Sequence, residues 1–273
     1  MAAETCRVAG CLPPLRPRCN GHRPACTVPG DMYAQNDELV SMYAFIVQLM
    51  APYCDFLLCH SMSCSREARA AALAAQAAGK DVWISWSVAA EPASCLLLGG
   101  QPLSEAVATV SDCHAVRAML VQCSVPSSTT LALQVLRQAV PPDVAIGAHL
   151  GHTRGADASE GVAGGSGGTL PPGEYAKHAQ AWIDGGASIV GGGSGFLPEH
   201  IAALSKQLLR RPRLPHPGST SGPRPSLDRL PPLSASLDAC RRGRMPLTSA
   251  EARWLLPRLL LLAIAAYVIC TSD

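Results

Sequence analysis

The feature that most constrains this chain is a regular alternation of short apolar runs with helix-forming segments between residues 7 and 211. The apolar runs are continuous and do not alternate with polar residues. Strands of this kind are typical of a parallel sheet whose faces are covered by helices. The predicted strands are Arg7–Leu15, Cys54–Cys59, Asp81–Val88, Ala118–Cys123, Asp143–His149 and Ala187–Gly191.

Helices are expected between these strands, because strong helix formers or apolar residues at helical spacing fill the intervening segments. The predicted helices are Asp37–Ala51, Ser65–Lys80, Gln101–Asp112, Pro126–Ala139, Pro172–Gly186 and Pro198–Arg211. A closed (β/α)8 barrel needs eight strand–helix units, and six are found here. The sequence therefore predicts an α/β fold of the TIM-barrel type that is incomplete, or else an open sheet.

The remaining segments have a different composition, which suggests four regions along the chain. A partial strand and an irregular segment are expected over residues 1–36, and the barrel portion over 37–211. Residues 212–253 are rich in proline, arginine and serine, which is typical of a disordered linker. Residues 254–273 are apolar and predict a C-terminal helix. The uncharged stretch Leu259–Cys270 is shorter than the roughly 20 residues of a membrane span, so packing on the barrel, or a sequence end without a selected structure, is favoured over a membrane anchor.

Charge and cysteine usage narrow the functional class. The net charge is only +2 and aromatic residues make up 4% of the chain, which argues against nucleic-acid binding. The twelve cysteines include no Cys-x-x-Cys pair, and Met1–Gly10 lacks the apolar core of a signal peptide. We therefore expect reduced thiols and a cytoplasmic location.

In parallel α/β folds the reactive groups lie at the carboxyl ends of the strands. The sequences at these ends resemble one known family. "YAKHAQAWIDGGASIVGGGSGFLPEHIAAL" resembles the last strand and helix of the homocysteine S-methyltransferases, which usually read Gly-Gly-Cys-Cys-Gly after the strand. "VAGCLPPL", "DFLLCHSMSCSREARAA" and "DVWISWSV" are similar to the third, fourth and fifth strands of the family. "LVQCS" stands where the family has Val-Asn-Cys, and "IGAHLGHT" where it has Gly-Ala-Tyr-Ala-Asn.

The resemblance implies methyl transfer from S-methylmethionine or betaine to homocysteine, which forms methionine. In this family Zn²⁺ is held by three cysteine thiolates and binds the substrate thiol, whose pKa it lowers. The matched blocks correspond to strands 3 to 8 of the barrel. Two sheet edges are then expected to be exposed, and a second copy of the chain or another partner would cover them.

The chain departs from the family at the implied zinc site. Cys123 matches one ligand, whereas Gly193 and Ser194 stand in place of the two adjacent cysteines. Cys123 is thus either a remnant ligand or a buried small apolar residue. His149 could join a rewired Cys/His metal site, since imidazole also suits zinc; the alternative is a histidine that lies at the barrel mouth by chance.

The implied substrate site also differs from the family. His60 and Ser61 replace a Glu-Thr pair, and that glutamate is expected to bind the homocysteine amino group. Gly191 and Gly192 are candidate substrate-binding residues, or else only part of a tight turn. Two functions remain open: a homocysteine S-methyltransferase with impaired activity, and an inactive relative or truncated product that acts as a binding or regulatory protein.

Overall fold

The computed structural model describes residues 7–15, 36–91, 95–151, 170–193, 195–208 and 267–269. All six predicted strands are present and pair in parallel, each with its neighbour in the sequence. The order across the sheet is β6-β5-β4-β3-β2-β1-β7. The parallel strands are β1 (Arg7–Leu12), β2 (Phe56–Met62), β3 (Val82–Ser87), β4 (Val116–Cys123), β5 (Ala145–Leu150) and β6 (Ile189–Gly192).

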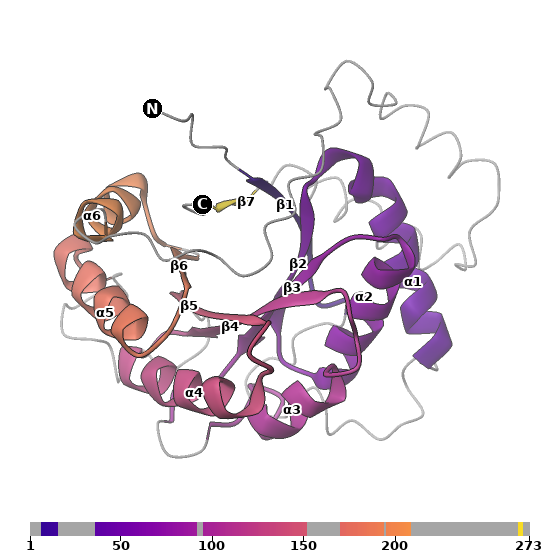
Figure 1. Ribbon diagram of the computed structural model, residues 1–273, viewed down its shortest axis with the longest axis horizontal. Helices are drawn as coiled ribbons and strands as arrows, with labels where there is room; N and C mark the ends of the chain where they lie inside the picture. The colour runs from indigo at the N-terminus through magenta and orange to yellow at the C-terminus, as the bar shows by residue number, and fades with distance from the viewer. Residues whose placement is uncertain are drawn as a thin grey trace.

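The helices follow one another along the outer, convex side of the curled sheet (Figure 1). They are α1 (Asn36–Met50), the short 3-10 helix η3 (Ala51–Tyr53), α2 (Ser65–Ala77), α3 (Leu103–Thr109), α4 (Pro126–Ala139), α5 (Pro172–Asp184) and α6 (Pro198–Leu208). The architecture is a partial (β/α) barrel, as the sequence predicts. Within the described residues, no helix is long and apolar enough to cross a membrane.

The sheet separates two apolar clusters. The larger cluster fills the space between the strands and the helices and contains Trp86, Tyr175 and Trp182. The smaller cluster lies on the other face and consists of Ala9, Phe56, Leu58, Trp83, Ala118, Leu120 and Ile189. Because side chains alternate between the two faces of a strand, this second cluster forms the floor of the concave side.

The prediction of a helix over residues 254–273 is wrong where the structure describes that segment. Tyr267–Ile269 form the strand β7, which pairs antiparallel with β1 through Arg7↔Ile269, Val8↔Val268 and Ala9↔Tyr267. Aromatic and β-branched residues favour strands, and the edge of β1 supplies hydrogen-bond partners. The rest of 254–273 and the predicted linker 212–253 lie outside the described residues.

The strand β7 covers part of the sheet edge that the sequence leaves exposed. We expect Val268→Pro to weaken this pairing, because proline is disfavoured within a paired strand, and to increase concentration-dependent self-association, because free sheet edges pair with other chains. Light scattering over a concentration series measures this effect, with Val268→Thr as the matched control. Equal association of both variants would contradict a protective role for β7.

Candidate functional site

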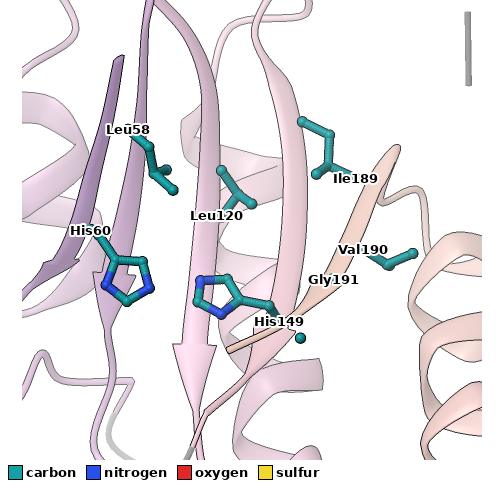
Figure 2. Close-up of a pocket in the computed structure, with 8 residues that line it drawn as sticks. Leu58, His60, Leu120, His149, Ile189, Val190 and Gly191 are labelled. Atoms are coloured by element: carbon teal, nitrogen blue, oxygen red, sulfur yellow. The ribbon is translucent and has the colours of Figure 1, made fainter. Parts of the chain in front are cut away.

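Buried polar side chains gather on the concave side at the carboxyl ends of the parallel strands. The register places Ser87, Gln122, His149 and Gly191 at one level across β3 to β6. His60 comes from the end of β2, next to this level. Figure 2 shows His60 and His149 side by side near the ends of their strands.

The two histidines form a stacked pair. Their ring centroids are 5.6 Å apart and their planes differ by 26°. Ser85 Oγ lies 2.7 Å from Nε2 of His149, while Nδ1 of His149 is buried without a hydrogen-bond partner. Burial, and secondarily the charge of His60, lowers the pKa of His149 from 6.5 to about 3. The imidazole of His149 is therefore neutral at physiological pH.

A second part of the site is a hydrogen-bonded chain from β2 to β4. The hydroxyl of Ser61 lies 2.8 Å from Nδ1 of His60 and donates to Oε1 of Gln122, also at 2.8 Å. Ser61 has φ 60°, in the left-handed region, and the pairing of β2 with β3 shifts register between Cys59 and Met62. A residue other than glycine in this conformation is strained, and such strain persists where surrounding contacts hold the residue in place.

Gln122 is a site residue that the sequence analysis did not single out. Its side-chain amide fills the space beside Gly151, where an added Cβ would lie 2.6 Å from Nε2 of Gln122. In the resembled family both positions carry asparagine. A longer amide at one position together with a glycine at the other is a sequence signal that the Gln122 side chain occupies the space beside Gly151.

Cys123 lies on the helix side of β4, not on the concave side. Its side chain belongs to the apolar cluster between strands and helices, as does that of Val121, whereas Leu120 faces the concave side. The thiol donates to the carbonyl of Ala89 (3.6 Å) and accepts from the amide of Val125 (3.5 Å). Burial raises the pKa of the Cys123 thiol, which favours the protonated form of the thiol in this environment.

The glycine-rich turn after β6 is closely packed. The hydroxyl of Tyr175 donates to the carbonyl of Gly191. A Cβ at Gly192 would lie 2.5 Å from Cβ of Phe196, so only glycine fits there. A Cβ at Gly193 would lie 3.1 Å from the carbonyl oxygen of Leu150 and 3.3 Å from Nδ1 of His149. Ser194 lies outside the described residues.

A small pocket of about 30 Å³ lies between this turn and the two histidines. Its volume corresponds to about two water molecules. Figure 2 shows its walls on the concave face of the sheet. The lining residues are Leu58, His60, Leu120, His149, Ile189, Val190, Gly191 and Gly192. Three of the four predicted substrate-binding residues thus line one pocket, namely His60, Gly191 and Gly192. The fourth, Ser61, contacts the ring of His60 through its hydroxyl group.

His200 has a structural role. Its Nδ1 accepts from the amide of Leu197 at 3.1 Å, and its Nε2 donates to the carbonyl of Leu170 at 2.9 Å. Both ring nitrogens are therefore engaged with the backbone around α6. This arrangement holds the start of the helix and leaves His200 no free nitrogen for a metal ion.

The described residues do not fit the zinc site that the resemblance implies. Among them, no three His, Cys, Asp or Glu side chains lie close enough together to hold a metal ion. Cys123 is engaged on the helix side, Gly193 has no side chain, and His149 binds Ser85. A structural or catalytic zinc site needs at least three protein ligands.

The comparisons with known proteins agree with the fold. The family model "Homocysteine S-methyltransferase" matches residues 1–208. The apo form of the homocysteine methyltransferase MmuM from Escherichia coli is 21% identical, with a TM-score of 0.51. The match covers 74% of this chain and 63% of MmuM, so the chain spans less than two thirds of that protein.

Two further MmuM structures are also similar. The oxidized form is 24% identical with a TM-score of 0.47, and the metallated form is 23% identical with a TM-score of 0.46; each match covers 65% of this chain and 54% of MmuM. No curated protein sequence matches the chain. The family model covers most of the chain, including every strand of the parallel sheet. This chain belongs to the homocysteine S-methyltransferase family.

Proposed function

We propose that this chain is a homocysteine S-methyltransferase relative in which methyl transfer to homocysteine is impaired, and that its reaction site serves as a binding pocket for a small molecule. The observation that carries the proposal is the position of Cys123. Its thiol is the one remaining family ligand, and it is buried and hydrogen-bonded to backbone groups on the helix side.

The positions of the other two family ligands support the same proposal. Gly193 offers no donor atom, and serine, which stands at 194, is a weak zinc ligand when its hydroxyl is neutral. Without the metal, the thiol of homocysteine keeps its ordinary pKa of about 8.5. Only a small fraction of it is then a thiolate at neutral pH, so attack on a methyl donor is slow.

The pocket itself supports a retained binding role. Ser61 is held in a strained conformation by two hydrogen bonds, and Ser85 fixes the ring of His149. Strained residues and buried polar networks are costly unless the surrounding structure specifies them. The concave end of the sheet is thus organised as a site, although the donor set of the metal is lost.

We expect the purified full chain, equilibrated with zinc, to hold much less than one zinc per molecule and to form no methionine above the uncatalysed rate. The assay supplies homocysteine with S-methylmethionine or betaine and measures methionine formation together with metal content. The variant Gly193→Cys/Ser194→Cys restores both family thiols and is expected to raise the zinc content. Stoichiometric zinc with turnover in the unaltered chain would show that the proposal is wrong.

A further inference from the structure

The helix α6 is the last helix on one side of the partial barrel. It packs on α5 and on β6, and β6 is itself an edge strand of the sheet. Figure 1 shows α6 at one end of the row of helices. The helix buries His200 and Leu204 against the protein, whereas Ile201, Ala202 and Ser205 are exposed. One side of α6 is therefore open to a further protein surface.

The open side of α6 carries large apolar side chains. Leu197, directly before the helix, is 52% exposed and Ile201 is 39% exposed, while Leu208 at the end of the helix is half-buried. Residues spaced by four and by seven lie along one line of an α-helix. Neighbouring exposed apolar residues favour contact with another protein surface. This line is therefore a candidate contact surface.

Two opposite charges form a second line on the same helix. Glu199 lies in the first turn of α6 and Lys206 in its last turn, and both side chains are exposed. They are two helical turns apart and so lie on the same line. Within the part of the chain that the structure describes, neither takes part in an ion pair. The line is acidic at one end and basic at the other.

This pattern is complementary to itself when the helix is reversed. Glu199 and Lys206 lie equally far from the midpoint between Ala202 and Ala203 in the sequence, and Leu197 and Leu208 do so as well. In an antiparallel pair with a two-fold axis at this midpoint, each Glu199 lies opposite Lys206 of the other copy, and the apolar lines meet. We propose that α6 is the contact surface of a symmetric dimer of this chain.

The contact is small, since α6 has only 11 residues. A helix of this length covers much less area than a permanent interface. The dimer is therefore weak, with a Kd on the order of 10 µM, and it forms and dissociates with the concentration of the chain. The inference does not depend on the proposed function.

The test is sedimentation velocity of the full chain in dilute buffer, from about 1 to about 200 µM. Glu199→Lys and Lys206→Glu each place like charges opposite one another in a dimer, and each is expected to weaken association about tenfold. An equimolar mixture of the two variants is expected to restore it. In a mixed pair the new lysine faces the new glutamate, and the unaltered Lys206 faces the unaltered Glu199.

A matched control makes the same charge change elsewhere. Glu105→Lys alters an exposed glutamate in the first turn of α3 and is expected to leave association unchanged. A monomer at every concentration of the unaltered chain would overturn the inference. A dimer that Glu199→Lys does not weaken, or a mixture that associates no better than the single variants, would overturn it as well.

A second pair of variants does not depend on charge and decides the case if a charge variant does not fold, as judged by circular dichroism. Ile201→Ser is expected to weaken association, because it removes an apolar side chain from the contact. Leu131→Ser, at a position on α4 that is 37% exposed, is the control and is expected to have no effect. Equal association of these two variants would contradict the placement of the interface on α6.

Discussion

Replacing Gly147 with alanine is expected to lower the free energy of unfolding by about 3 kcal/mol or more. A Cβ at this position in β5 would lie 2.5 Å from the carbonyl oxygen of Ile189 and 2.7 Å from its Cβ. The clash involves the backbone of β6, which cannot rotate away as a flexible side chain can. The two strands must separate, and the Gly147↔Ile189 pair at which β6 joins the sheet is lost.

Urea denaturation followed by circular dichroism measures this loss. The matched control is Gly191→Ala in β6, because nothing lies within 4 Å of a Cβ there and its φ is not positive. We expect the control to change stability by less than about 0.5 kcal/mol. A similarly small effect of Gly147→Ala would contradict the close approach of β5 and β6.

The second large effect is a loss of stability in mildly acidic solution. The pKa of His149 is lowered to about 3 in the folded chain, mainly by burial, and is about 6.5 in an unfolded chain. Between these values the unfolded state binds one proton more than the folded state. The contribution of neutral His149 to the free energy of unfolding is therefore fully present above pH 6.5. Below pH 6.5 the free energy of unfolding falls by up to about 1.4 kcal/mol per pH unit.

Denaturation curves between pH 7.5 and 5 are expected to show this slope, in a range where carboxyl groups with ordinary pKa values stay ionised. His149→Gln removes the titrating group and is expected to flatten the dependence. His114→Gln replaces an exposed histidine and serves as the control. If the slope persists unchanged in His149→Gln, the buried imidazole is not its source.

The positions of the strands and helices could be predicted because local features determine them. Continuous apolar runs mark the parallel strands, and proline opens helices such as α4 (Pro126–Ala139), whose predicted bounds are confirmed. The strand β7 could not be predicted in this way. A short apolar run fits a helix or a strand equally well, and the choice depends on the edge of β1, which is distant in sequence.

The proximity of the candidate residues could be predicted from the sequence, but their contacts could not. Strand ends and the family resemblance indicate His60, Gly191 and Gly192, and the structure brings them to one pocket. Side chains alternate between the two faces along β4, so the face on which Cys123 lies depends on where this alternation places the last residue of the strand. A short sequence motif does not reveal this face. The contact from Ser61 to Gln122 depends on the irregular pairing of β2 and β3, and no local sequence pattern encodes it.

The shared space of Gln122 and Gly151 has a consequence for how this chain could change over time. Gly151→Asn alone, a step toward the family residue, would collide with the amide of Gln122. Gln122→Asn alone would shorten the side chain that accepts from Ser61 and leave a void beside Gly151. Each single change therefore disturbs a contact made by the other position, so the effects of the two changes are expected to be coupled. Laboratory selection for the family residues is therefore expected to favour variants in which both positions have changed.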